Sequence, residues 1–216
     1  MKLKYFTVAV ALFFLLPGSS CFGETAEKYY PLKEGMTWVY SATSNKAGAQ
    51  KITVTNLAPR ELQGKTVTPR KWEVGGNVRN FFIGQDDHGI YRYAEQMAAN
   101  VEPKIVTPKV YYLKNPLDKG TDWDNITKMG ENELKVNIIV EGIRETVQVP
   151  AGTYKECVKL KHEGSMQEAK TSFALTAYEW YAPGVGLVKS LFTIKKKVDG
   201  KEDTESSTYQ LESFKP

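Results

Sequence analysis

The sequence of 216 residues is poor in the side chains from which reactive sites are usually built. It contains two cysteines and two histidines. His88 and His162 lie in different halves of the chain, and neither a His-x-x-x-His nor a Cys-x-x-Cys spacing occurs. Zinc sites usually show such spacings. The sequence therefore predicts no metal site, and it predicts that both histidines face solvent.

The common catalytic signatures are absent as well. There is no Gly-x-Ser-x-Gly elbow, and neither a dinucleotide-binding nor a P-loop glycine pattern occurs. Acidic residues are numerous but scattered, and Asp86-Asp87 lacks the ligand periodicity of a calcium loop. We therefore expect a protein that is not an enzyme and has no cofactor. A cleft with converging carboxylates, or an exposed Cys157 with a low pKa, would favour an enzyme instead.

No strong excess of charge marks a nucleic-acid partner. The formal net charge is +4, and it falls to +2 without residues 1–21, which contain Lys2 and Lys4 but no acidic residue. The densest basic cluster is the run at 195–197. Nucleic-acid binding needs a clustered basic face. The composition therefore argues against a nucleic-acid partner, and we interpret the lysine run as a solvated strand end.

Long apolar runs are limited to the N-terminus. Residues 1–23 resemble a bacterial secretory signal, because Lys2 and Lys4 precede an eleven-residue apolar stretch, residues 6–16, that Pro17 ends. This stretch is too short for a standard transmembrane helix. No later stretch approaches eighteen apolar residues. We therefore expect an exported protein whose signal is removed.

Two cleavage sites compete at the end of this signal. Residues 18–21, Gly-Ser-Ser-Cys, resemble a bacterial lipobox, in which Cys21 would be lipidated and become the new N-terminus. Gly18 departs from that motif, which usually has Leu there. The alternative is cleavage after Gly23. The expected location is the periplasm or the outer membrane, with Cys21 as a lipid anchor. Either choice leaves Cys157 without an intramolecular partner, and we expect it to be a half-buried, small hydrophobic residue.

One motif occurs twice. Residues 31–38 and 116–123 both read Pro-Leu-x-x-Gly-x-x-Trp, at an offset of 85 residues. We interpret each copy as the entrance to a β lobe and predict an internal duplication of about ninety residues. The predicted organisation is a first β lobe at 24–93, a connection at 94–115 and a second β lobe at 116–216, packed together as one domain.

Apolar residues recur with the period of a β-strand almost throughout. The clearest example is the alternation of Leu134, Val136, Ile138 and Val140 with more polar neighbours. Asp199-Gly200 is a strong signal for a two-residue hairpin turn. The sequence therefore predicts an all-β fold with ten to twelve antiparallel strands. We expect a strongly curved sheet or incomplete barrel of two similar lobes, and a β-sandwich is the alternative.

Three motifs carry a family resemblance. The first is Pro-Leu-x-x-Gly-x-x-Trp-x-Tyr at 31–40, the second Val-Pro-Ala-Gly-Thr-Tyr at 149–154, and the third Tyr-Ala-Pro-Gly-Val-Gly-Leu-Val-Lys at 181–189. Together they resemble a group of uncharacterised bacterial exported proteins and lipoproteins. This resemblance implies no activity and no catalytic residue. Exported β proteins of this size also resemble, at the level of fold alone, half-barrel lipoprotein carriers that hold an acyl chain in an apolar concavity.

The aromatic residues supply the candidate site. They would pack as core, or they would line an apolar pocket on the concave face of the sheet. The sequence thus favours a cell-envelope protein that binds a hydrophobic small molecule or lipid; the alternative is a structural or interaction module with an envelope protein partner and no small ligand. Membrane contact is expected through a lipid anchor only. The candidate pocket residues are Trp38, Tyr40, Trp72, Trp123, Tyr178, Trp180 and Phe192.

Overall fold

A computed structural model describes residues 24–129, 132–168 and 171–216. Cys21 lies outside these residues. The described chain consists almost entirely of antiparallel β-strands, so the predicted fold class is confirmed. One short helix, α1 (Ala26–Tyr29), precedes the strands. The strands are β1 (Thr37–Ser44), β2 (Gly48–Asn56), β3 (Arg60–Leu62), β4 (Lys65–Val74), β5 (Asn77–Asp86), β6 (Gly89–Gln96), β7 (Lys104–Lys114), β8 (Asp122–Met129), β9 (Asn132–Val149), β10 (Gly152–Glu168), β11 (Thr171–Ala182), β12 (Gly186–Val198) and β13 (Lys201–Lys215).

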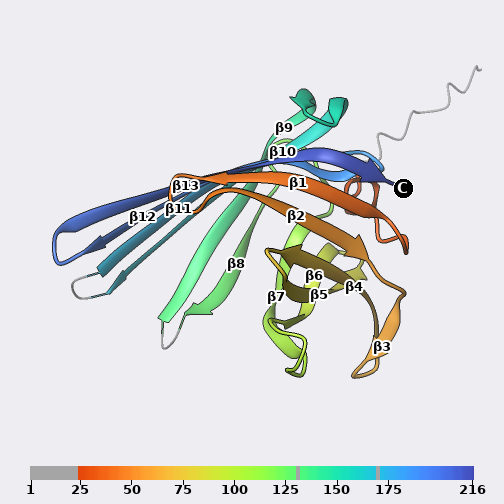
Figure 1. Ribbon diagram of the computed structural model, residues 1–216, viewed down its shortest axis with the longest axis horizontal. Helices are drawn as coiled ribbons and strands as arrows, with labels where there is room; N and C mark the ends of the chain where they lie inside the picture. The colour runs from red at the N-terminus through yellow and green to blue at the C-terminus, as the bar shows by residue number, and fades with distance from the viewer. Residues whose placement is uncertain (1–23, 130–131, 169–170) are drawn as a thin grey trace, which may run out of the picture.

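The strands follow one another around a single sheet in the order of the chain. The order is β7-β6-β5-β4-β2-β1-β13-β12-β11-β10-β9-β8, and β3 pairs with β4 beside this path. The first strand therefore pairs with the last, over eight residue pairs from Thr37 opposite Lys215 to Ser44 opposite Ser207. The sheet curls into a nearly closed barrel with one seam, between β7 and β8 (Figure 1). The incomplete barrel is thus the observed architecture, and not the sandwich.

Backbone conformation explains the sharp turns between neighbouring strands. Asp199 and Gly200 join β12 to β13 with φ of 48° and 81°. Val198 pairs with Lys201, so the loop contains two residues. A two-residue turn with positive φ at both positions matches the right-handed twist of the flanking strands. The predicted hairpin at this position is confirmed.

The two copies of the repeated motif make the same backbone contacts. Gly35 and Gly120 have φ of 83° and 92°. The N–H of Gly35 donates to the carbonyl of Asn56 (2.9 Å), and the N–H of Asn56 donates to the carbonyl of Met36 (3.0 Å).

In the second copy, the N–H of Gly120 donates to the carbonyl of Val140 (2.9 Å), and the N–H of Val140 donates to the carbonyl of Thr121 (2.8 Å). Each copy leads into the first strand of a six-strand run, β1 or β8. The copies are therefore locally equivalent. A common origin of the two halves stays a prediction.

The segment expected to connect the lobes contains a strand. Residues 104–114 form β7, which pairs with β6 and completes the first run of strands. Its alternation of apolar and polar residues is interrupted because Pro108 lies within it. A proline is tolerated here because β7 lies at an edge of the sheet, where one row of N–H groups needs no ladder partner.

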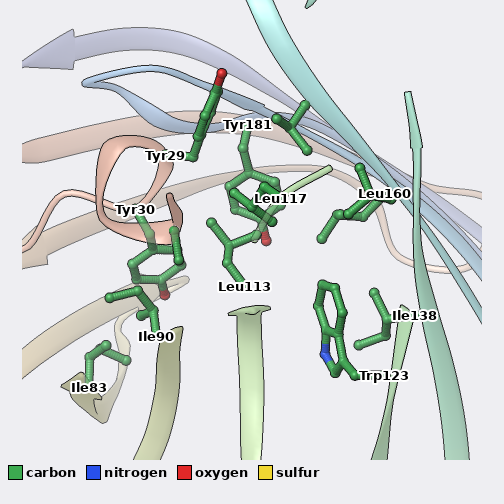
Figure 2. Packing of buried hydrophobic residues seen from close by; sticks show 13 residues of the cluster. Tyr29, Tyr30, Ile83, Ile90, Leu113, Leu117, Trp123, Ile138, Leu160 and Tyr181 are labelled. Carbon is green, nitrogen blue, oxygen red and sulfur yellow. The ribbon is translucent and has the colours of Figure 1, made fainter. Parts of the chain in front are cut away.

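Side chains from both halves meet in the largest core cluster (Figure 2). Tyr29 and Tyr30 reach it from the N-terminal segment, Leu113 from the end of β7, Trp123 from β8 and Leu160 from β10. All five are buried. Complete burial of a side chain of leucine size contributes about 1.5–3 kcal/mol. The cluster therefore holds the two halves together as one packed unit.

A side chain bridges the seam where the ladder is missing. The amide of Asn125 on β8 accepts a hydrogen bond from the Tyr111 N–H (3.0 Å) and donates one to the Tyr111 carbonyl (2.8 Å). The indole of Trp123 also points at that carbonyl, at 3.4 Å. Asn125 is buried. Its amide thus satisfies the buried backbone groups of Tyr111 as a neighbouring strand would.

Among the described residues, no helix is long and apolar enough to cross a membrane.

Candidate functional site

A cavity of about 470 Å³ lies between strands of both halves. Its wall contains aromatic rings, aliphatic side chains, three arginines and one glutamate. A neighbouring hollow of about 320 Å³ shares Trp72, Val74 and Arg79 with it, so the two are adjacent. The residues lining the cavity are Tyr30, Tyr40, Val54, Arg70, Trp72, Val74, Asn77, Arg79, Phe81, Arg92, Tyr112, Glu179, Tyr181 and Leu187.

Strand alternation on β4 places three of these residues side by side. Arg70, Trp72 and Val74 occupy every second position of β4, so their side chains emerge on the same face of the sheet. All three line the cavity. The ring of Trp72 packs edge-on against Phe81 of β5, with ring centres 5.9 Å apart. β4 and β5 therefore supply an aromatic wall that carries a guanidinium group.

The N-terminal segment supplies Tyr30, whose ring lies against that guanidinium. Tyr30 stacks on Tyr112 of β7 with ring centres 5.2 Å apart. The Arg70 guanidinium lies 4.1 Å from the centre of the Tyr30 ring. Helix α1 is held in place because the N–H of Ala26 donates to the side-chain carbonyl of Asn115 (2.7 Å). The segment therefore packs into the barrel and forms part of the cavity wall.

The hydroxyl of Tyr40 on β1 is tied to β12, the second strand along the sheet. Tyr40 donates to the carbonyl of Leu187 on β12, at 2.8 Å. Both residues line the cavity. Burial raises the pKa of the Tyr40 hydroxyl well above its usual range, and the nearby Arg70 opposes that effect in part. Tyr40 therefore remains a neutral donor at all ordinary pH values.

Two charged groups of the wall already have partners. The Arg92 guanidinium donates to the Tyr112 hydroxyl (3.0 Å) and to Glu95 (3.1 Å). The Glu179 carboxylate accepts a hydrogen bond from the Tyr181 hydroxyl (2.6 Å) and lies 3.3 Å from Nε2 of His162.

Burial alone would raise the pKa of Glu179, but the neighbouring His162 and the hydrogen bond from the Tyr181 hydroxyl bring it below its usual value. Glu179 is therefore ionised at neutral pH, and its carboxylate has partners within the protein.

Two of the seven predicted pocket residues, Tyr40 and Trp72, line the cavity. Trp38 and Trp123 are buried in separate core clusters, where the indole of Trp38 donates to the carbonyl of Val185 (2.6 Å). Phe192 lies opposite Ala177 and away from the cavity lining.

Tyr178 and Trp180 lie on the other face of the sheet. They alternate along β11 with Glu179 and Tyr181, which line the cavity. Trp180 instead donates to Glu145 (2.7 Å), and the ammonium groups of Lys159 and Lys189 lie over its ring. Aromatic content alone gave no information about which face each residue occupies.

The cavity residues that sequence reasoning missed include Tyr30, Arg70, Arg92 and Tyr112. A signal for Arg70 was present, since it lies in phase with Trp72 on a strand whose aromatic face was expected to point inward. Tyr30 and Tyr112 had no such signal, because Tyr30 comes from an irregular segment and Tyr112 from β7, within the predicted connection.

The remaining reactive side chains lie outside the cavity lining. His88 is exposed as expected, but His162 was expected to face solvent and its side chain is only 16% exposed, because it pairs with Glu179. Cys157 is completely buried rather than half-buried. Within the described ranges, no group of three or more His, Cys, Asp or Glu residues is arranged to hold a metal ion.

A family model described as DUF3108-like matches residues 33–201, which is most of the chain. The chain belongs to the DUF3108-like family. No curated protein matches it. The fold of this DUF3108-like chain is similar to a crystal structure from Bacteroides fragilis, described as that of an exported protein with a YmcC-like fold. The sequence identity is 18%, the match covers 91% of this chain and 100% of the other, and the TM-score is 0.50.

A second crystal structure, described as that of a lipoprotein from Parabacteroides distasonis, also has 18% identity to this DUF3108-like chain. It covers 90% of this chain and 99% of the other, with a TM-score of 0.42. At such identities the likeness concerns the fold alone. The function must therefore be argued from the cavity itself.

Proposed function

We propose that this chain is a non-enzymatic protein of the bacterial cell envelope that binds a hydrophobic or lipid-like molecule inside its barrel. The observation that carries the proposal is the cavity of about 470 Å³ and its lining. Small-molecule sites are typically concave, of about 300–1,000 Å³, and mostly apolar with a few placed polar groups. This cavity has that size and that composition.

The apolar part of the lining is built from both halves of the barrel. Aromatic rings contribute the largest area per residue, and they keep their shape on binding because they have few rotatable bonds. Aliphatic side chains fill the space between them. A chain-like ligand would therefore find a preformed apolar surface. The apolar lining consists of Tyr30, Tyr40, Val54, Trp72, Val74, Phe81, Tyr112, Tyr181 and Leu187.

Export is supported by the N-terminal sequence and by the fold. Residues 1–23 have the charge and hydrophobicity pattern of a secretory signal, and Cys21 is placed as in a lipoprotein signal. The Bacteroides fragilis protein of similar fold is described as exported. We infer a location in the periplasm or at the outer membrane, with Cys21 as the point of lipidation.

Native mass spectrometry tests the binding function. The protein is extracted gently from its own envelope, and we expect an excess mass that is released on denaturation. The matched variants are Val74→Trp, which places a large ring in the cavity, and Val78→Trp. Val78 pairs with Glu73, which neighbours Val74 on the strand, so it lies on the other face of the sheet. Only Val74→Trp should lose the excess mass.

One observation favours a second function, that of an interaction module in an envelope complex. β7 pairs with β6 alone and β8 with β9 alone, so two strand edges flank the seam. Unpaired edges can accept a strand from another protein. A bare polypeptide mass for the wild-type protein, together with a co-purifying envelope protein, would favour this function over ligand binding.

A further inference from the structure

One cation in the cavity wall is buried without a counter-ion. Arg70 is only 7% exposed. Within the described part of the chain, no carboxylate pairs with its guanidinium. Its hydrogen bonds go to neutral oxygens, the side-chain carbonyl of Asn56 (2.8 Å) and the backbone carbonyl of Pro31 (2.8 Å). A buried, uncompensated charge costs several kcal/mol, so its retention calls for an anion.

The guanidinium is held in a fixed orientation. Asn56, which accepts from its Nε, is itself buried and donates to the carbonyls of Pro31 and Lys33, both at 3.1 Å. The rings of Tyr30 and Trp38 lie 4.1 and 4.7 Å from the guanidinium carbon. Arginine has five N–H donors, and two hydrogen bonds leave several of them for a ligand. This is the arrangement of a pre-positioned anion receptor.

A second guanidinium lies on the same wall. Arg79 of β5 is exposed, pairs across the strands with Trp72 and lines both the cavity and the neighbouring hollow. None of the described ion pairs contains Arg79, although the Glu205 carboxylate also lines the neighbouring hollow. Of the other charged groups in the lining, Arg92 pairs with Glu95 outside it, so Arg70 and Arg79 stand against Glu179 alone. The unbalanced charge of the cavity is therefore positive.

We propose that the cavity takes an anionic amphiphile, whose carboxylate or phosphate head group pairs with the Arg70 guanidinium while its single apolar chain lies along Trp72, Val54 and Val74. The inference rests on the proposed function and adds the chemistry of the ligand. A planar guanidinium matches the two oxygens of a carboxylate or a phosphate through paired hydrogen bonds. Arg79, which is nearer to solvent, attracts the anionic head group as it enters the cavity.

The experiment compares four probes on the delipidated mature protein by isothermal titration calorimetry. Oleate and oleoyl lysophosphatidate carry the anionic group, monooleoylglycerol has the same chain without a charge, and inorganic phosphate has the charge without a chain. We expect both anionic lipids to bind at least tenfold more tightly than monooleoylglycerol. Their relative affinities distinguish a carboxylate from a phosphate ligand. Phosphate alone is expected not to compete at millimolar concentration.

The variants assign the preference to a residue. Arg70→Gln should lose the tenfold preference and retain binding of monooleoylglycerol. The matched control is Arg60→Gln, because Arg60 is exposed and does not line the cavity. Arg79→Gln should weaken oleate binding about threefold. This variant replaces Arg70→Gln in the experiment if Arg70→Gln does not fold.

Equal affinity for oleate and monooleoylglycerol would overturn this inference and leave the proposed function intact. Binding of neither would overturn both. If phosphate competes as well as lysophosphatidate, the site binds a free anion. That result would also overturn the proposal of an amphiphilic ligand.

Discussion

At the scale of single residues, Cys157 shows how burial decides the chemistry of a side chain. The thiol lies in a core cluster with Val147, Val149 and Val188. Burial, together with the carboxylates of Glu145 and Glu156, raises its pKa to about 11. A thiolate is the reactive form of cysteine. The high pKa and the lack of exposure together make this thiol unsuited to nucleophilic catalysis.

We expect Cys157 to be inert in the folded protein. In a chain that begins at Glu24, where it is the single cysteine, Ellman's reagent at pH 7.5 should modify it at least a hundredfold more slowly than in 6 M guanidinium chloride. The reason is that reaction requires both opening of the core and ionisation of the thiol. Comparable rates in the two solvents would contradict the burial described above.

Glu179 makes stability depend on pH. Its pKa in the folded protein is below the unfolded value of about 4.3. The stabilisation is therefore complete above that unfolded value, and it is lost as the pH falls through the lowered folded pKa. We expect Glu179→Gln to cost about 1–3 kcal/mol at pH 6 and less at pH 3, as measured by urea unfolding.

The control for this variant is Glu163→Gln, since the Glu163 side chain is 59% exposed and pairs with Lys161 at the surface. It should cost less than about 1 kcal/mol at either pH. A cost of Glu179→Gln that stays the same at pH 6 and pH 3 would show that the carboxylate charge is not what stabilises the fold.

At the scale of elements, the repeated glycines define the entrances to β1 and β8. Gly35 and Gly120 have positive φ, and a Cβ atom built at either position would meet nothing within 4 Å. An alanine there would therefore add backbone strain without a steric clash. The two positions are equivalent in conformation and in hydrogen bonding, so their substitution costs should also be equivalent.

We expect Gly35→Ala and Gly120→Ala each to lower the free energy of unfolding by about 1–2 kcal/mol, which is the usual cost of a left-handed conformation. Chemical denaturation of each variant measures this. Lys119→Ala, at an exposed position beside Gly120, should be nearly neutral. Costs that differ by more than about 1 kcal/mol between the two glycines would argue that the motif copies play different roles.

Strand prediction succeeded where the two faces of a strand differ in polarity. Leu134, Ile138 and Val140 are buried on β9, as their alternation indicated. Strand prediction failed on β7, because Pro108 breaks its alternation and because it has a ladder partner on one side only. The seam could not be predicted at all, because Asn125 reads as an ordinary polar strand residue until its amide is placed opposite Tyr111.

At the scale of the molecule, the curved sheet could be predicted from the period of two, but the composition of the cavity could not. Its lining combines residues as distant in sequence as Tyr30 and Leu187. Their meeting depends on how far the sheet curls and on where the N-terminal segment packs. Local patterns contain neither quantity. Tyr30 and Tyr112 were missed for that reason, whereas the phase of Arg70 with Trp72 on β4 was a local signal.

The anchoring of the whole molecule is tested at Cys21. If this residue carries lipid, the wild-type protein should label with a radioactive or alkynyl fatty acid and sediment with membranes. Cys21→Ser should abolish the label and move most of the protein to the soluble fraction. Cys157→Ser is the matched control and should leave both readouts unchanged. Labelling that persists in Cys21→Ser would exclude this residue as the anchor.

The order of strands has one more consequence. The peptide chain passes from the first six-strand run to the second between β7 and β8, which is also where the ladder is open. Cutting the chain there would sever no strand pairing, and the β1–β13 ladder and the shared core would still join the pieces. The protein is thus equivalent to a heterodimer whose two subunits share one covalent tether, and co-expressed fragments 24–115 and 116–216 should reassemble into the same barrel.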